Sequence, residues 1–151
     1  YIKFFLGTCH LALHDTHKAL DCFEEALKLD PHIEDMASIY AYMGICLKDL
    51  QHYRDALTTL EKAESHDNER TDIYNLMGFC YFKLKKHEKA IDCFKKVLKL
   101  DPSSAIDYAN IASNYRDMGH KESAMRYYRL ALELDPTIDF ASENLARLEG
   151  K

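Results

Sequence analysis

A unit of 34 residues recurs along this chain, and this repeat limits the possible folds more than any other feature of the sequence. Its clearest copy runs from Tyr74 to Pro102. The first apolar residues of this copy, beginning at Tyr74, follow the i, i+3, i+4, i+7 spacing of one helical stripe. A polar break at residues 85–87 precedes a second apolar set with helical spacing. The unit is therefore predicted to be two helices joined by a short turn.

Four columns of the repeat keep their residue character from copy to copy. They hold a small residue in the first helix (Gly7, Gly44, Gly78, Ala112), alanine in the second (Ala19, Ala56, Ala90, Ala124), a large residue (Phe23, Leu60, Phe94, Tyr128) and a small apolar one (Ala26, Ala63, Val97, Ala131). Small residues let two helices approach closely, and the large ones fill the space beside them. The first junction is longer than the others, with three extra residues within 32–36.

The same columns resemble the tetratricopeptide repeat (TPR) family, whose pattern is W-x2-L-G-x2-Y, then A-x3-F, then P. The Leu-Gly pair corresponds to Leu6-Gly7, Met43-Gly44, Met77-Gly78 and Ile111-Ala112. The tryptophan position holds Tyr40, Tyr74 and Tyr108, the tyrosine position holds Tyr81 and Tyr115 but also His10 and Leu47, and the closing position holds Pro31, Asn68, Pro102 and Pro136. The resemblance implies a superhelix with a concave groove that binds other proteins, in a family that is seldom catalytic.

We therefore predict an all-α fold, a right-handed α-solenoid of four TPR helix pairs plus a C-terminal helix. The repeats are expected at about 1–33, 37–70, 71–104 and 105–138, within one domain spanning 1–151. The helices are predicted near 1–13, 16–29, 35–48, 51–66, 70–83, 86–99, 104–117 and 120–133, with Gly119 in a tight turn. The terminal helix, at about 138–148, is either a capping helix or the first helix of a truncated fifth repeat. The chain begins within a repeat and without methionine, which indicates a piece of a longer protein.

Composition excludes some classes of function. The formal net charge of −5 and the isoelectric point near 5.9 argue against a nucleic-acid partner, which favours basic surfaces. No apolar run reaches the roughly 18–20 residues that span a bilayer. The five cysteines repeat in register and lack a C-x-x-C pair, which indicates packing residues in a reducing compartment. We expect a cytoplasmic protein.

The face of each first helix that points away from its partner helix is where the family resemblance places a binding groove. The candidate peptide-binding residues are Phe5, Thr8, Tyr42, Ile45, Asn75, Phe79, Phe82, Asn110, Ser113, Arg116 and Asn144. For Phe5, Tyr42 and Leu76, packing against a neighbouring repeat is as well supported as a place in the groove. For Phe79 and Phe82 we expect side chains that are partly exposed to solvent. An aromatic concave surface suits an apolar peptide or an amphipathic helix of a protein partner.

Two TPR subclasses bind peptides in more specific ways. One clamps a C-terminal carboxylate of chaperone peptides with lysine, asparagine and arginine, but the corresponding positions here hold Phe4, Thr8, Tyr42, Asp72 and Leu76. We therefore expect no such clamp. The other carries a ladder of asparagines, of which only Asn110 and Asn144 match. This pair could hydrogen-bond the backbone of a partner.

Catalytic and metal-binding motifs are not found in the sequence. Cys9, His10 and His14 lie close together on one predicted helix, but no H-E-x-x-H, paired C-x-x-C or phosphate-binding glycine motif accompanies them. We predict no metal, no cofactor and no enzymatic activity in this region. Two alternatives stay open: a self-assembly module, or a substrate-adaptor region of a larger enzyme.

The close of the second repeat is unusual. Glu64 and His66 replace leucines of the other copies, and Asn68 replaces proline. Because stability in a repeat array is approximately a sum over neighbouring interfaces, we expect less apolar burial and a looser junction here.

Overall fold

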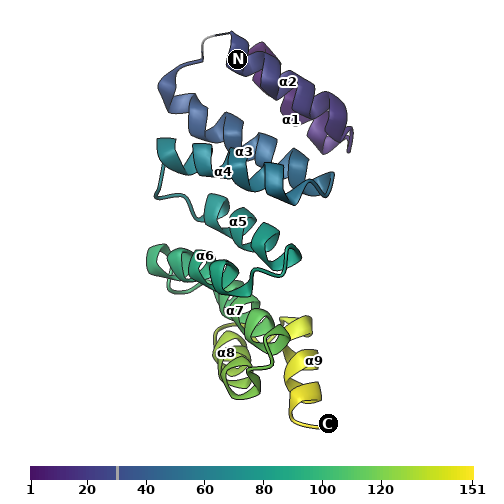
Figure 1. The fold of residues 1–151 in the computed structure, drawn as a ribbon, viewed down its shortest axis with the longest axis vertical. Coiled ribbons are helices and arrows are strands. Elements are labelled where there is room, and N and C mark those ends of the chain that lie inside the picture. The colour runs from purple at the N-terminus through teal and green to yellow at the C-terminus, as the bar shows by residue number, and fades with distance from the viewer. Residues whose placement is uncertain (30) are drawn as a thin grey trace. The chain divides into compact units, whose positions relative to one another are not determined.

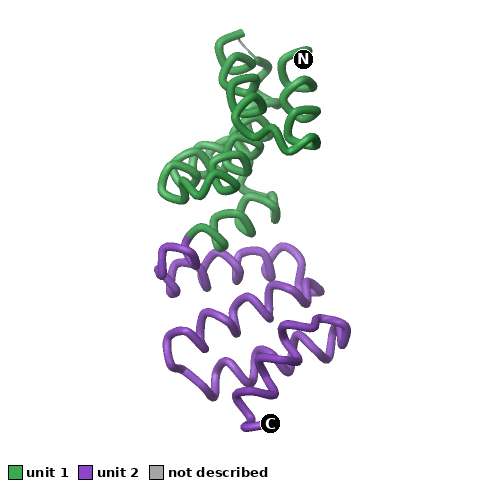
Figure 2. The backbone as a smooth tube through the Cα atoms, turned by 90° about the vertical axis from the view of Figure 1, so that its right-hand side faces the viewer, with its two compact units in different colours: residues 1–80 green, residues 81–151 purple. Residues whose placement is uncertain are grey.

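The computed structural model describes residues 1–29 and 31–151, and within these residues the chain has nine helices and no strand. None of the described helices combines the length and the apolar character that crossing a bilayer requires. The contacts divide the chain into two compact units, residues 1–80 and 81–151 (Figure 2). A single domain over 1–151 stays a prediction.

The first unit contains two complete helix pairs and most of a fifth helix, and Figure 1 labels these helices. Its helices are α1 (Ile2–Ala12), α2 (Thr16–Lys28), α3 (Ile33–Asp49), α4 (Tyr53–His66) and α5 (Thr71–Lys83) as far as Cys80. α1 packs against α2, α2 packs against α3, and α3 packs against α4. The second helix of the first repeat therefore lies between two first helices.

The second unit begins with the end of α5 and repeats the same arrangement. It contains α6 (His87–Leu100), α7 (Ala105–Asp117), α8 (Lys121–Leu134) and α9 (Asp139–Leu148). α6 packs against α7, α7 against α8, and α8 against α9. These bounds agree with the predicted helices to within two residues everywhere in the chain, which confirms the all-α repeat fold.

The turn after each first helix has the same backbone conformation in four repeats. His14, Gln51, Lys85 and Gly119, which occupy one column, have φ angles of 60°, 63°, 58° and 81°. In all four repeats the following residue donates its N–H to a carbonyl five residues back, as His120 does to Tyr115 at 2.9 Å. The turn predicted at Gly119 is confirmed. Three non-glycine residues adopt the same left-handed conformation.

The three extra residues of the first junction lengthen a helix rather than a loop. α3 has 17 residues, whereas α5 and α7 have 13, and it begins at Ile33 rather than near residue 35. Glu34 and Asp35 lie in its first turn, where carboxylates interact favourably with the helix dipole. The insertion therefore adds about one helical turn before the repeat pattern resumes.

The repeat columns form the cores of both units. All four alanines of the second-helix column and the large residues beside them are buried. A Cβ atom built on Gly7 would lie 2.7 Å from the Phe23 ring, and one built on Gly44 would lie 2.5 Å from a methyl group of Leu60. The close approach predicted for the small-residue column is therefore confirmed at both glycines.

Polar side chains replace apolar ones at the close of the second repeat, and they form specific contacts. The Tyr74 hydroxyl lies 3.0 Å from a carboxylate oxygen of Glu64 and 2.9 Å from the carbonyl oxygen of Asn68. The imidazole of His66 stacks on the Tyr40 ring with centroids 5.8 Å apart. Arg70 donates to the Ser38 hydroxyl at 2.9 Å. The looser junction expected from these substitutions stays a prediction.

The cysteines divide into one exposed and four buried side chains. Cys22, Cys46, Cys80 and Cys93 are buried, as their column positions predict, whereas Cys9 is exposed because no described helix covers its side of α1. Packing is therefore the wrong role for Cys9. Burial raises the pKa of Cys46 to about 12 and that of Cys80 to about 11.

Thiol reactivity should separate these two groups. We expect Cys9 to react rapidly with a thiol reagent in the native protein, because its exposed side chain is accessible to the reagent. The other four should react only on unfolding. Counting modified thiols by mass spectrometry with and without denaturant measures this difference, and a native Cys9→Ser variant should show no fast phase. A second fast thiol in the native wild type would contradict the burial described here.

Candidate functional site: the exposed faces of the first helices

In the first unit, the candidate residues on α1 and α3 differ in how deeply their side chains are buried. Thr8 is half-buried, and its hydroxyl donates to the Phe5 carbonyl oxygen at 2.8 Å. Tyr42 is half-buried and stacks on Phe23 with centroids 5.4 Å apart, while Phe4 meets it edge-on at 5.5 Å. Tyr42 therefore contributes to packing between the first two repeats. Phe5, its counterpart in α1, is exposed.

Phe79 presents an aromatic ring on the surface of the first unit. Its side chain is 38% exposed, although it belongs to a first helix that packs within a repeat array. The ammonium group of Lys48 lies 5.4 Å from the ring centroid, and the Tyr53 ring meets it edge-on at 6.2 Å. Lys48 is in turn paired with Asp49 at 3.1 Å. The ring is thus held by neighbours from α3 and α4 while part of it faces solvent.

The remaining candidates of the first unit are less exposed. Ile45 on α3 and Asn75 on α5 are both half-buried. Asp72, at a position where the clamp subclass needs a cation, is exposed and accepts two hydrogen bonds from Arg70, at 2.7 Å and 3.1 Å. The first unit therefore combines a partly exposed aromatic ring with a carboxylate that is already neutralised by an arginine.

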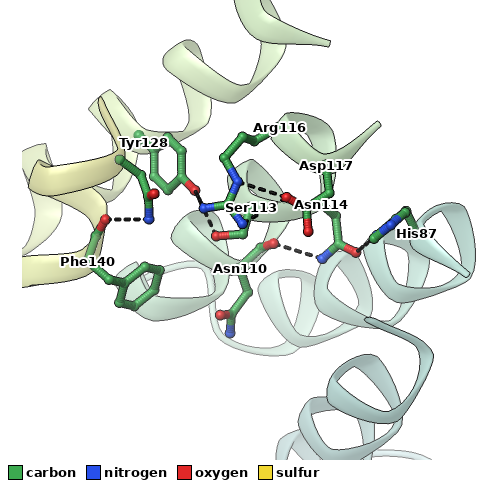
Figure 3. A network of polar contacts seen from close by, with 9 residues as sticks. His87, Asn110, Ser113, Asn114, Arg116, Asp117, Tyr128 and Phe140 are labelled. Carbon is green, nitrogen blue, oxygen red and sulfur yellow. Dashed lines mark hydrogen bonds and ion pairs between the residues drawn. The ribbon is translucent and has the colours of Figure 1, made fainter. Parts of the chain in front are cut away.

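In the second unit, a buried tyrosine hydroxyl reaches the polar candidates on α7 (Figure 3). The Tyr128 oxygen lies 2.8 Å from Ser113 Oγ, and Arg116 Nη1 donates to it at 3.4 Å. Arg116 also pairs with Asp117 through Nε and Nη2, both at 2.8 Å. Ser113 and Arg116, predicted as separate groove residues, are therefore joined in one network through a residue of α8.

The electrostatics of this network keep its groups in their ordinary charge states. Burial raises the pKa of the Tyr128 hydroxyl, so it remains protonated at neutral pH. Loss of water lowers the pKa of Arg116, but its hydrogen bond to Asp117 and the nearby negative charge outweigh this effect, and the pKa lies above its usual value. The network therefore has no net charge, because the positive charge of Arg116 is balanced by the carboxylate of Asp117.

A second polar chain connects α6 to α7. Asn114 is buried; its amide nitrogen donates to the Asn110 carbonyl oxygen at 2.9 Å, and its amide oxygen lies 2.9 Å from His87 Nδ1. The Phe82 ring, half-buried, meets His87 edge-on at 5.8 Å. In the part of the chain that the structure describes, no hydrogen bond joins the half-buried side-chain amide of Asn110 to another group.

Asn144, the second member of the asparagine pair, lies on α9. It is half-buried, and its amide nitrogen donates to the Phe140 carbonyl oxygen at 2.7 Å, which leaves its amide oxygen to accept from another group. Asn110 and Asn144, 34 residues apart, thus lie on α7 and α9 of the same unit. Asn110 offers a complete amide, and Asn144 offers an acceptor.

Several neighbours of the candidate residues could not be inferred from the groove columns alone. Tyr53 contacts Phe79, and His87 and Asn114 form the link between α6 and α7, yet the periodic pattern assigned none of these three a role. One signal was available: Tyr128 is the only residue of the large-residue column that carries a hydroxyl. A buried tyrosine hydroxyl needs a polar partner, and Ser113 is the nearest residue that supplies one.

Comparison with known proteins gives a consistent assignment of fold. Residues 4–108 match the model described as the cytochrome c-type biogenesis protein H TPR domain, and residues 108–138 match a tetratricopeptide repeat model. Comparison with curated protein sequences gives no match.

Three solved structures illustrate the likeness in fold. MamA from Desulfovibrio magneticus RS-1 has a TM-score of 0.88 at 20% identity, covering 97% of this chain and 81% of that one. YrrB, described as a TPR protein with an unusual peptide-binding site, has a TM-score of 0.84 at 22% identity, covering 91% and 70%. The first TPR domain of Spaghetti (RPAP3), bound to the HSP90 peptide SRMEEVD, has a TM-score of 0.73 at 20% identity, covering 78% and 93%. With family models matching most of its length, this chain belongs to the tetratricopeptide repeat family.

Proposed function

We propose that this chain is a non-catalytic protein-interaction module that binds a polypeptide partner on the exposed faces of its first helices. The observation that carries this proposal is the partly exposed Phe79 ring between Lys48 and Tyr53. An aromatic ring that is held in place by its neighbours loses little conformational freedom on binding, so such rings are favoured as contact residues. YrrB is described as having a peptide-binding site and the RPAP3 domain as bound to an HSP90 peptide, and these two neighbours support the same kind of role.

The chemistry of the first unit favours an apolar partner segment over an acidic one. Beside Phe79 the ammonium group of Lys48 is paired with Asp49, and the negative charge of Asp72 would repel a carboxylate of the partner. A partner that inserts an aliphatic or aromatic side chain against Phe79 would displace water from an apolar ring. No charged group would have to be buried without its ion-pair partner. The expected ligand is therefore a peptide or amphipathic helix with exposed apolar side chains.

The second unit supports binding to a peptide backbone. The amide of Asn110 can donate to a backbone carbonyl and accept from a backbone N–H, and the amide oxygen of Asn144 can accept. Ser113 and Arg116 contribute through their positions beside Asn110, although their own hydrogen bonds already connect them to Tyr128. These hydrogen bonds would not depend on the side-chain sequence of the partner, because they are made to its backbone.

A peptide selection followed by matched variants tests the role of Phe79. Peptides would be selected from a random display library on the immobilised chain, and the affinity of the best binders measured by fluorescence anisotropy. We expect Phe79→Ala to weaken binding by roughly tenfold or more, because truncation of an aromatic contact residue typically costs over about 1 kcal/mol. The melting temperature should change little, since part of the ring already faces solvent.

The control is Leu130→Ala on α8, because Leu130 has nearly the same exposure, 37%, but lies on a second helix. It should leave peptide affinity unchanged. The peptide SRMEEVD serves as a second control, and we expect it to bind far more weakly than the selected peptides because the chain lacks the cations that a carboxylate clamp needs. Equal effects of Phe79→Ala and Leu130→Ala on affinity would argue against a binding role for Phe79.

A further inference from the structure

Seven lysines of the third repeat gather at the turn between α5 and α6 and along α6 itself. All seven are exposed and lie in the second unit: Lys83, Lys85, Lys86, Lys89, Lys95, Lys96 and Lys99. The chain has a formal net charge of −5, so removing these seven positive charges from the total leaves −12 for the other residues. We call the seven residues the lysine belt; it is a basic region on an otherwise acidic chain.

The other repeats do not share this charge. The same seven columns hold two lysines and three carboxylates in the first repeat, one lysine and three carboxylates in the second, and one arginine and two carboxylates in the fourth. All four repeats nevertheless form the same helix pair. The fold therefore does not require lysine at these positions, and the charge of the third repeat needs another explanation.

The lysines of α6 lie on one face of the helix. At about 100° per residue, the exposed residues from Glu88 to Lys99 fall within an arc of roughly 120°. The opposite face is buried in the core and consists of Ala90, Ile91, Cys93, Phe94 and Val97. From Lys86 to Lys99 the belt is about 20 Å long. About six residues of extended peptide span the same length.

Much of this charge is not neutralised by ion pairs. Within residues 1–29 and 31–151, which the structure describes, no ion pair engages four of the lysines: Lys85, Lys86, Lys95 and Lys99. The ammonium group of Lys89 lies 5.7 Å from the centroid of the Tyr81 ring, which does not cancel its charge. A ligand with several negative charges would relieve the mutual repulsion of these ammonium groups.

An open hollow lies at the first turn of α6, beside three lysines of the belt. It has a volume of about 480 Å³ and is lined by Lys85, Lys86, His87, Glu88, Lys89 and Met118. Met118 is half-buried and supplies an apolar surface. The His87 ring is held by Asn114, whose amide oxygen lies 2.9 Å from Nδ1 (Figure 3). The hollow can therefore receive an apolar side chain whose neighbours in sequence carry negative charge.

We propose that the lysine belt binds an acidic segment of a partner protein, in which carboxylates flank an apolar side chain. The carboxylates pair with the lysines along α6, and the apolar side chain enters the hollow beside Met118. A single exposed ion pair contributes little, so the affinity comes from several pairs acting together and from electrostatically steered association. The belt is separate from the first-helix faces of the proposed function and adds a second binding surface.

A protein partner fits the belt better than a nucleic acid or a membrane does. The basic side chains are all lysines, whereas arginine is the residue that matches phosphate groups through paired hydrogen bonds. Glu88 and Asp92 lie within the same face of α6. A peptide can place uncharged residues opposite these carboxylates, which a phosphate backbone cannot do. The apolar face of α6 is packed in the core and is not free to insert between lipids.

Fluorescence anisotropy with a labelled acidic peptide tests the proposal. The probe has four glutamates on each side of a central leucine and is titrated with the chain at low salt. The wild type is expected to bind, and Lys85→Gln/Lys86→Gln/Lys89→Gln to raise the dissociation constant by roughly tenfold or more, because three ion pairs are lost. Glutamine suits the turn, since Gln51 occupies the column of Lys85 in the second repeat with a φ angle of 63°.

The matched control is Lys28→Gln/Lys62→Gln/Lys121→Gln, which removes the same charge from exposed lysines outside the belt. It should leave the affinity within about twofold of the wild type, because charges far from the probe are screened. Phe79→Ala should leave it unchanged as well, which separates this inference from the proposed function. The peptide SRMEEVD, with three side-chain carboxylates, should bind more weakly than the probe. Equal weakening by the two triple variants would overturn the proposal, as would a wild type that does not bind the probe.

Competition identifies the class of partner. Unlabelled probe peptide, duplex DNA and phosphatidylserine vesicles are each added to the labelled complex, and we expect the peptide to displace it at the lowest concentration of negative charge. Displacement by DNA or vesicles at a lower concentration would overturn the assignment to a protein. A probe with serine in place of leucine should bind roughly threefold more weakly or worse, since it loses apolar contact in the hollow. Equal affinity of the leucine and serine probes would contradict the role given to the hollow.

Discussion

Replacing Tyr128 with alanine is expected to lower the free energy of unfolding by about 3–5 kcal/mol, the range for truncation of a buried aromatic side chain. The Tyr128 side chain is 0% exposed and packs among the small residues of α7 and α8, including Ala112 and Ala124. These alanines cannot extend into the space that the ring leaves, so a cavity remains. Denaturant unfolding followed by circular dichroism measures the loss, which suits a chain without tryptophan.

Tyr128→Phe separates the packing of the ring from the hydrogen bonds of its hydroxyl. The variant keeps the ring and removes the oxygen that contacts Ser113 and Arg116, so we expect a cost of only about 1 kcal/mol. Arg116 retains its pairing with Asp117, and Ser113 is half-buried rather than sealed from water. A cost for Tyr128→Phe equal to that of Tyr128→Ala would show that the hydroxyl network, and not ring packing, provides the stability.

A double-mutant cycle with Ser113→Ala measures the contact between Ser113 and Tyr128 directly. If the 2.8 Å hydrogen bond stabilises the unit, the costs of Ser113→Ala and Tyr128→Phe should not add, because either change removes the same contact. Additive costs would mean that the two hydroxyl groups interact with water rather than with each other.

Periodicity predicted the fold well because every copy of the repeat places residues of the same size at the same helix contacts. Ala19, Ala56, Ala90 and Ala124 each occupy a position where only a small side chain fits, and four agreeing positions leave little ambiguity about which helices pair. The exception was α3, whose extra N-terminal turn does not repeat elsewhere. A single insertion carries no periodic signal, and the sequence alone could not decide between a longer loop and a longer helix.

The candidate site was less predictable because exposure depends on neighbours from other helices. The helical angle places Tyr42 and Phe79 on similar faces of first helices. Yet Tyr42 packs on Phe23 and Phe4, while Phe79 remains partly exposed between Lys48 and Tyr53. The difference arises from side chains on other helices, which are distant in sequence from Tyr42 and Phe79. Periodicity also gives Phe5 and Cys9 the environment of Tyr42 and Cys46, whereas Phe5 and Cys9 are exposed in the structure.

The effect of Gly44→Ala on the free energy of unfolding is expected to depend on the residue that faces Gly44, which is Leu60. Leu60→Ala is expected to destabilise the first unit by about 2–5 kcal/mol, since Leu60 is fully buried between helices of the second repeat. Gly44→Ala alone is also expected to be destabilising, because its Cβ would lie 2.5 Å and 2.7 Å from two side-chain carbons of Leu60. Such overpacking costs about 1–3 kcal/mol. Helix propensity offsets this only in part, since alanine gains about 1 kcal/mol over glycine.

In the Leu60→Ala background the effect of Gly44→Ala should reverse. With the leucine side chain removed, the new methyl group meets no close atom and partly fills the cavity, so the helix-propensity gain of about 1 kcal/mol remains and the double variant should be more stable than Leu60→Ala alone. Chemical unfolding of the wild type, both single variants and the double variant gives the coupling energy. If Gly44→Ala changed stability by the same amount in both backgrounds, contact with Leu60 would not be the reason that this position holds glycine, and the close approach of α3 and α4 would need another cause.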